Sequence, residues 1–229
     1  MGSTIANSSP LTAAACGSGL QDSVNDPMPQ RVVDLREVIV PDQQMILQLS
    51  RRVRVMARFD EVLATFWADG DHGAQPALTD ETVREAERVL GVTPPSALLD
   101  LLRVQNGGVV AADHDAFPTS RPTSWSEDHV PFDALMGIGG LERMTSLLAT
   151  PYLVKEWGLP SPIVLLSGDG HCWIGLDYRG CGPDGDPSVT WFDIELDSEL
   201  TLASDFRTFV ENLTAASGFD LDPGGSPSN

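Results

Sequence analysis

The chain has 229 residues, of which 33 are acidic and 14 are Lys or Arg, so its formal net charge is −19. Hydrophobic residues make up 41% of the chain, which predicts a folded core in one large domain or one domain with an appendage. A chain this acidic is repelled by phosphate groups, which excludes nucleic acid and anionic membrane surfaces as expected partners.

The cysteines Cys16, Cys172 and Cys181 are odd in number and contain no CxxC pair, which is typical of a reducing compartment. No run of 18 apolar residues is present, and the first residues lack the basic start and apolar stretch of a secretory signal. We therefore expect a cytoplasmic protein with no transmembrane span.

The first part of the chain is expected to be peripheral. Residues 1–30 are rich in Ser, Ala, Gly, Asn and Pro without a periodic apolar face, which predicts a flexible, dispensable leader. Residues 31–59 are expected to form a strand and helix extension, because an apolar run spans 32–40 and helical spacing spans 43–66. The polar face of that helix holds four arginines, which suit a solvated face pairing with the acidic body or, alternatively, a site for an anionic ligand.

Two helices with a rigid corner are predicted next. Thr79 precedes acidic residues and an apolar stripe, so a helix is expected to begin there and to end at Gly91. Pro94-Pro95 forces an extended approach into a third helix, roughly 96–104, which stops at Asn106-Gly107-Gly108.

The second half changes period. Residues 111–133 are polar and proline-rich, which predicts a long surface loop, and a helix is expected at about 141–156. Short apolar runs separated by turn residues predict an antiparallel meander with one apolar face, and helical spacing returns over 203–214 before a frayed tail, 215–229. The strands are expected at 163–167, 172–178 and 188–194. The fold class is therefore α+β, an antiparallel-rich sheet with helices packed on it.

Catalytic chemistry is not expected. His171 and Cys172 are the only plausible reactive neighbours, but adjacent strand residues point to opposite faces, so they are poorly placed to share a proton. The same alternation argues against a metal site there, and Gly168-Asp169-Gly170 lacks the remainder of a dinucleotide or phosphate loop. We expect no cofactor and no metal, with an enzyme kept as the rival hypothesis.

Two groups of punctuating residues remain distinctive. The first group comprises the helix ending in Leu90-Gly91, the Pro94-Pro95 corner and Asn106-Gly107-Gly108. The second comprises Trp157-Gly158-Leu159-Pro160 and the stretches 168–178 and 189–193, followed by a helix with Phe206 and Phe209. In this order, over about residues 60–214, the sequence resembles the SUKH superfamily, the Smi/Knr-like domain.

The resemblance implies a protein-binding function without catalytic residues. Bacterial members act as immunity proteins that bind and neutralise toxins, often nucleases, while fungal relatives act as interaction hubs in cell-wall regulation. Charge gives an independent argument, since residues 59–229 carry a net charge of −20 and a nuclease must present a basic surface to its substrate. We expect an immunity protein with a basic toxin as partner; the alternatives are a regulatory scaffold and, third, a small-molecule sensor.

Candidate contact residues are the acids in flexible segments punctuated by Pro and Gly. Each of them has the alternative of being an ordinary solvated surface acid. They are Asp113, Asp115, Glu127 and Asp128 in the long loop, and Asp184 and Asp186 at a hairpin tip.

Overall fold

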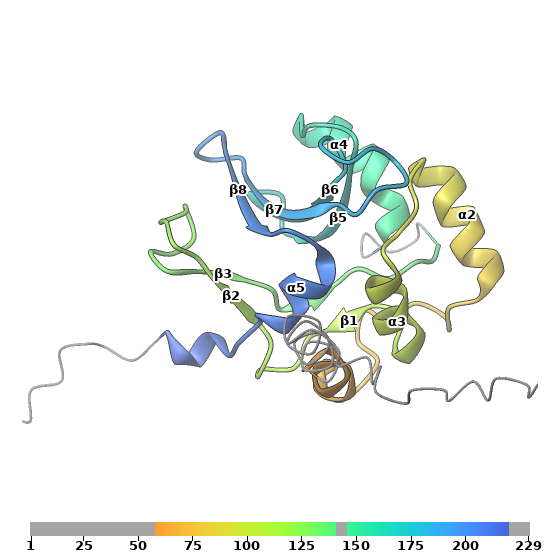
Figure 1. The fold of residues 1–229 in the computed structure, drawn as a ribbon, viewed down its shortest axis with the longest axis horizontal. Coiled ribbons are helices and arrows are strands. Elements are labelled where there is room, and N and C mark those ends of the chain that lie inside the picture. Colours follow the sequence, from red (N-terminus) through yellow and green to blue (C-terminus); the bar gives the residue numbers. More distant parts are fainter. Residues whose placement is uncertain (1–57, 141–145, 220–229) are drawn as a thin grey trace, which may run out of the picture. The chain divides into compact units, whose positions relative to one another are not determined.

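The computed structural model of the chain describes residues 58–140 and 146–219 (Figure 1). These residues belong to one compact unit, Gln43–Asn229. The predicted leader, the strand and helix extension up to residue 57, and residues 220–229 of the predicted tail lie outside the described residues. Residues 58–65 are helical, as the spacing over 43–66 predicts, and Phe59 is buried. Within the described ranges, no helix is long and apolar enough to cross a membrane.

The predicted pair of helices is confirmed. Helix α2, Asp80–Leu90, begins with a capping box in which Thr79 and Thr82 each accept a hydrogen bond from the other's backbone N–H. It ends at Gly91, whose φ of 70° is a conformation that glycine adopts without strain. Helix α3, Ser96–Val104, buries Leu98, Leu101 and Leu102.

The turn after α3 is locked to a later segment of the chain. Strand β1, Gly108–Val109, pairs antiparallel with β4, Ala134–Leu135. The buried Asn106 side chain donates to the carbonyls of Pro76 and Ile138, at 2.6 and 2.7 Å, and accepts from the Ile138 N–H at 2.8 Å. One side chain therefore joins three segments that are distant in sequence.

The prediction of a long surface loop over 111–133 is wrong in part. Strands β2, Ala116–Pro118, and β3, His129–Pro131, form an antiparallel hairpin within this range. Phe117 and Phe132 are buried against Phe209, with ring centroids 5.0 and 4.9 Å apart. Aromatic burial thus outweighs the turn-forming residues of this range, of which Pro118 and Pro131 themselves lie in the two strands.

The helix predicted at about 141–156 begins later than expected. Residues 141–145 lie outside the described residues, and Ser146 is extended and bridges Gly137. A 3-10 turn, η1, Leu147–Ala149, then leads into helix α4, Thr150–Trp157. Pro151 in the first turn is where a helix accepts proline readily.

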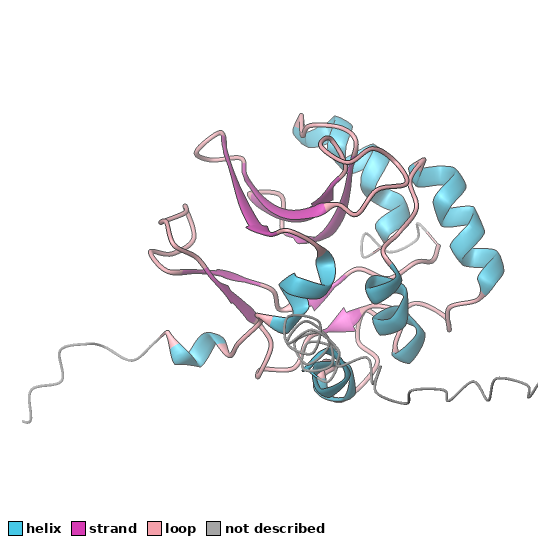
Figure 2. Cartoon of the chain, in the orientation of Figure 1, coloured by secondary structure: helices cyan, strands magenta, loops and turns pink. Residues whose placement is uncertain are grey.

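A four-stranded antiparallel sheet of order β5-β6-β7-β8 forms the other half of the core (Figure 2). Its strands are β5, Ile163–Gly168, β6, Cys172–Asp177, β7, Ser188–Asp193, and β8, Ser198–Ala203. The first three confirm the predicted meander. Strand β8 was not predicted, and it takes Ala203, so that the last helix, α5, is confined to Phe206–Glu211.

The predicted single apolar face of the sheet is wrong, because both faces are covered. On β6, Ile174 is buried on the face that looks toward the hairpin, and Trp173 is buried on the opposite face, with its ring centroid 6.5 Å from that of Trp157 in α4. The packed chain also extends beyond residue 214. A 3-10 turn, η2, Ala216–Gly218, follows, and Phe219 stacks on His129 at 4.3 Å between ring centroids.

Candidate functional site

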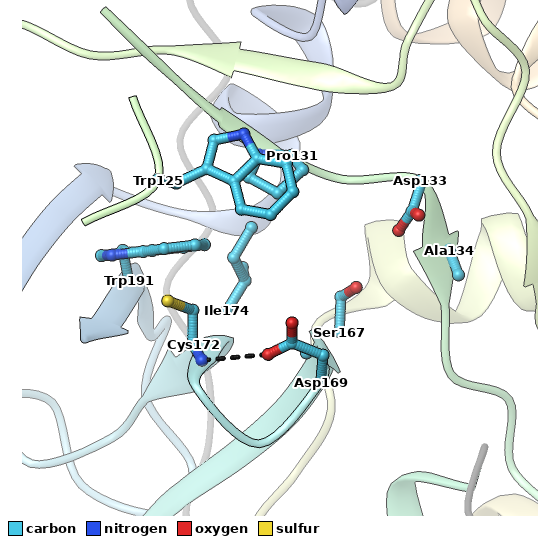
Figure 3. Close-up of a pocket in the computed structure, with 10 residues that line it drawn as sticks. Trp125, Pro131, Asp133, Ala134, Ser167, Asp169, Cys172, Ile174 and Trp191 are labelled. Atoms are coloured by element: carbon cyan, nitrogen blue, oxygen red, sulfur yellow. Dashed lines mark hydrogen bonds between the residues drawn. The ribbon is translucent and has the colours of Figure 1, made fainter. Parts of the chain in front are cut away.

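A cleft of about 270 Å³ lies between the β2–β3 hairpin and the four-stranded sheet (Figure 3). We call it the hairpin cleft. Its walls come from the hairpin and β4 on one side and from β5, β6 and β7 on the other. It is lined by Trp125, Pro131, Asp133, Ala134, Ser167, Gly168, Asp169, Cys172, Ile174 and Trp191.

One end of the hairpin cleft is aromatic and apolar. Trp191 of β7 and Ile174 of β6 are paired in register, so their side chains lie side by side on the same face of the sheet. Trp125, at the hairpin tip, lies over them and remains 54% exposed (Figure 3). An exposed tryptophan above a buried one forms a surface on which an aliphatic or planar group can pack.

The buried carboxylate of Asp193 holds the hairpin tip in this position. Its Oδ2 accepts a hydrogen bond from the Ser124 N–H at 2.9 Å, and its Oδ1 accepts one from the Leu196 N–H at 3.0 Å. Burial acts to raise the pKa of Asp193, but these hydrogen bonds outweigh it and the pKa lies below its ordinary value. Trp125 follows Ser124 directly, so Asp193 sets where the exposed indole sits.

The other end of the hairpin cleft is acidic. Asp169 is fixed by the backbone N–H groups of His171 and Cys172, which donate to its Oδ1 at 2.9 and 3.2 Å. Asp133 is exposed at the start of the β4 segment. Figure 3 shows both carboxylates pointing into the cleft, with the Ser167 hydroxyl between them. The Ser167 residue is only 8% exposed, the described residues show no hydrogen bond to its hydroxyl, and the hydroxyl oxygen is reached from the cleft.

A second hollow, of about 330 Å³, continues from the acidic end. It shares Ala134, Ser167 and Gly168 with the hairpin cleft and ends at His72 and the half-exposed Val109. The two hollows are therefore neighbours. Across the described residues, the side chains lining them include no Lys or Arg.

His171 and Cys172, the two neighbours that could have formed a reactive pair, do not contact each other through their side chains. The Cys172 thiol lies in the cleft, but its neighbour is the Ser124 hydroxyl, 3.4 Å away, and not a histidine. Burial raises the pKa of this thiol, which disfavours the nucleophilic thiolate. His171 instead points toward Glu195, with 3.2 Å between Nδ1 and Oε1. Over residues 58–140 and 146–219, no group of three or more His, Cys, Asp or Glu side chains could hold a metal ion.

The four predicted contact acids of the long loop lie in residues 113–131, which comprise the β2–β3 hairpin and the residues just before it and which we call the hairpin arm. Asp113 is exposed before β2, while Asp115 accepts a hydrogen bond from the Ala216 N–H at 2.6 Å and so fixes the chain after α5. Glu127 is exposed between the hairpin tip and β3. Asp128 is also exposed, and its hydrogen bond with His129, at 2.9 Å, lowers its pKa.

The other two predicted acids lie at the opposite end of the sheet, in the β6–β7 connection. Asp184 accepts a hydrogen bond from the Thr93 hydroxyl at 3.0 Å, and Tyr178 donates to the Thr93 carbonyl at 2.9 Å. Burial, followed by the neighbouring Asp205 carboxylate, raises the pKa of Asp186. The structure therefore does not bring the six predicted acids together into one site.

The residues that form the hairpin cleft were not predicted as a site. Asp133 and Asp169 are single acids, and Trp125 is an isolated aromatic within a polar stretch, so spacing gave no signal for them. The sequence signal that exists is a tryptophan, Trp125, in a segment otherwise rich in Pro, Ser and Asp. A cleft formed by the hairpin, β4 and three strands of the sheet becomes visible only when the hairpin folds onto the sheet.

Comparison with known proteins places the fold in a family. The model of the SMI1 / KNR4 family (SUKH-1) matches residues 77–212, which run from just before α2 to just after α5. No curated protein matches the chain. The matched region contains all of the hairpin cleft and of the four-stranded sheet.

Proposed function

The chain belongs to the SMI1/KNR4 family (SUKH-1), and from this premise we propose that it is a cytoplasmic immunity protein that neutralises a bacterial toxin, of the nuclease type, by direct binding. The family includes toxin immunity proteins and Smi1/Knr4 regulators. Binding without turnover agrees with the Cys172 thiol, whose pKa is raised and whose neighbour is a hydroxyl rather than a base.

The observation that carries the proposal is the net charge of −20 on residues 59–229. Toxins that cleave nucleic acid need a basic surface, and an acidic protein can cover that surface and accelerate its own association by electrostatic steering. Asp113, Glu127 and Asp128 are exposed on the hairpin arm, where they are available to such a partner. Asp115 and Asp184 are engaged in internal hydrogen bonds, so we expect their contribution to binding to be smaller.

The proposal is tested with the protein encoded by the gene next to this one, since an immunity gene usually neighbours its toxin. The two purified proteins are mixed, and complex formation and residual nuclease activity are measured. We expect inhibition to be complete at an equimolar ratio and the affinity to fall steeply with added salt. Binding that is indifferent to ionic strength would contradict the electrostatic part of the proposal, and a neighbour that neither binds nor is inhibited would contradict the immunity function.

The regulatory alternative predicts a different result in the same experiment. A scaffold of the Smi1/Knr4 type would bind a cellular protein whose own activity does not threaten the cell. Deletion of the gene therefore separates the two cases: loss of an immunity protein is tolerated only when the toxin gene is deleted as well. A strain that lacks this gene and grows normally with an active toxin gene would refute immunity.

A further inference from the structure

We propose that the hairpin cleft is the recognition site for an arginine side chain of the partner protein, with the guanidinium between Asp133 and Asp169 and the aliphatic stem packed against Trp125. This inference rests on the proposed function, because it names the residue type by which a basic partner is recognised. It commits the partner to an exposed arginine that enters the cleft.

The cleft carries uncompensated negative charge. The charged side chains that line the cleft are two aspartates, and no basic side chain within the described residues lines it to neutralise them. In the described structure, neither carboxylate is paired with a Lys or Arg. Asp169 accepts backbone N–H bonds through Oδ1, which leaves its Oδ2 free for a ligand. A cation entering here would meet two carboxylates with unused acceptor capacity.

The Ser167 hydroxyl faces the same end of the cleft. Ser167 is only 8% exposed, and its hydroxyl oxygen is not among the fully enclosed polar atoms, so what remains accessible of it opens into the cleft. In the described residues this hydroxyl makes no hydrogen bond, and Figure 3 shows it aimed into the cleft beside Asp133 and Asp169. It is an acceptor placed where a ligand's N–H group would complete it.

The cleft combines an acidic end with an aromatic end. The acidic end lies next to Ile174 and the two indoles of Trp125 and Trp191, so one ligand can present a cation to the acids and an apolar or planar group to the rings. Arginine provides both, since its planar guanidinium carries five donors, stacks on aromatic faces and follows an aliphatic stem. A volume of about 270 Å³ suits a side chain better than a folded element.

The experiment uses the full chain and a small probe, so that it does not depend on the identity of the partner. N-acetyl-arginine amide is titrated into the isotope-labelled protein, and the indole N–H signals of the five tryptophans are followed by NMR. N-acetyl-citrulline amide is the matched control, because it replaces the guanidinium by a neutral group of the same shape. We expect the Trp125 and Trp191 signals to shift with the arginine probe and to stay unchanged with citrulline.

Three variants assign the response to the acidic end. Asp133→Asn and Asp169→Asn each remove a charge, and Asn at 169 still offers an oxygen to the backbone N–H groups of His171 and Cys172. Ser167→Ala removes a hydroxyl that makes no internal hydrogen bond among the described residues. Each variant should weaken the binding of the arginine probe by about threefold or more, since hydrogen bonds to charged groups are among the strong ones. Glu156→Gln is the control, because Glu156 is exposed on α4, on the opposite face of the sheet.

The outcomes are distinguishable from those of the proposed function. A response to arginine that Asp133→Asn and Asp169→Asn do not reduce, or an equal response to citrulline, would overturn the arginine site. If the arginine site is refuted in this way while the toxin still binds, the partner docks elsewhere and the proposed function stands. With the neighbour-encoded toxin, the proposal expects Asp133→Asn to weaken binding by about tenfold while Glu156→Gln changes it by less than about twofold. Equal effects of the two variants would also refute it.

Discussion

Asp193 is buried at the end of β7, where its two carboxylate oxygens accept backbone hydrogen bonds from Ser124 and Leu196. The first of these bonds crosses from the sheet to the hairpin tip, a separation of 69 residues along the chain. In the sequence Asp193 looks like one of the chain's 33 acids. The structure gives Asp193 a positioning role for Trp125.

Replacing Asp193 with Ala should release the hairpin tip from the sheet. Two backbone donors would lose their charged acceptor, so we expect a loss of about 2–3 kcal/mol in the free energy of unfolding. Glu195→Ala is the control, since Glu195 is exposed and its contact with His171 is a surface pair worth less than about 1 kcal/mol. Urea unfolding measures both, and a loss for Asp193→Ala no larger than for Glu195→Ala would disprove the anchoring role.

Glu211 in α5 shows the opposite electrostatic behaviour. The residue is 7% exposed, its Oε1 has no hydrogen-bond partner in the described part of the chain, and burial raises its pKa despite the nearby Arg207 and Arg58. A carboxyl whose folded pKa is raised favours the folded state at low pH, and that advantage is lost as the pH rises through the folded pKa.

Glu211→Gln removes this titration. Relative to the natural chain, the variant should gain stability as the pH is raised from about 4, near the ordinary Glu pKa, to about 7. Thermal unfolding of both proteins across this range measures the difference in melting temperature. A difference that shrinks toward pH 7 would mean that Glu211 is charged and stabilising in the folded protein.

At the scale of elements, the sequence predicted those whose ends carry strong signals. Thr79 and Gly91 bound α2, and Asn106-Gly107-Gly108 ends α3, because caps and glycine turns act locally. The hairpin β2–β3 escaped prediction because Phe117 and Phe132 pack on Phe209, which is far away in the sequence. Strand β8 escaped prediction for another reason: it is largely exposed and lacks the buried apolar run of the other strands, although it pairs with β7 directly before it. The prolines of the hairpin segment favour a loop, but the contacts of Phe117 and Phe132 with Phe209 stabilise the hairpin instead.

The same limit applies to the candidate site. The family resemblance and the acidic balance could be inferred from the chain alone. The cleft could not, because Trp125, Asp133, Ser167 and Asp169 are brought together by a hairpin that folds across the sheet. Asp115 and Asp184 were predicted as surface contacts, but each accepts an internal hydrogen bond from a distant residue.

Gly107 lies in the turn after α3, where its backbone packs closely against Gly137. Its φ is +86°, and a Cβ there would collide with the backbone of Gly137, while a Cβ on Gly137 would collide with the carbonyl of Asn106. Gly107→Ala should therefore destabilise the fold by about 2 kcal/mol or more, through both backbone strain and the clash.

Gly180→Ala is the matched control for this turn. Gly180 lies in the β6–β7 connection with open space around it, so the substitution should change stability by less than about 0.5 kcal/mol. Denaturant unfolding compares the two variants. If Gly107→Ala proved too unstable to purify, a pulse of proteolysis on the freshly made proteins would give the ranking, and equal resistance would contradict the interlock.

At the scale of the whole molecule, the main feature is the excess of acidic over basic side chains. Residues 59–229 carry a net of −20, and the ion pairs of the described residues are mostly exposed, such as Arg88 with Glu85 and Arg103 with Asp100. Arg179 differs from these pairs, because its side chain is less exposed and binds two carboxylates, Asp177 of β6 and Glu199 of β8, across the sheet. Exposed pairs contribute about 0–1 kcal/mol each, so they offset little of the repulsion among the excess acids.

Added salt should therefore stabilise the protein at neutral pH. Raising NaCl from about 0.02 M to about 0.5 M shortens the Debye length from roughly 20 Å to about 4 Å, which screens the repulsion between acids on different elements. The same screening weakens the few ion pairs, but the excess of negative charge makes the net effect favourable, and we expect a gain of about 1 kcal/mol in the free energy of unfolding. Near pH 4, where many carboxyls are protonated, the gain should shrink, because the repulsion that salt relieves is then smaller. Thermal unfolding at both pH values measures the effect, and a stability at pH 7 that falls with salt would show that the ion pairs, with Arg179 first among them, outweigh the repulsion.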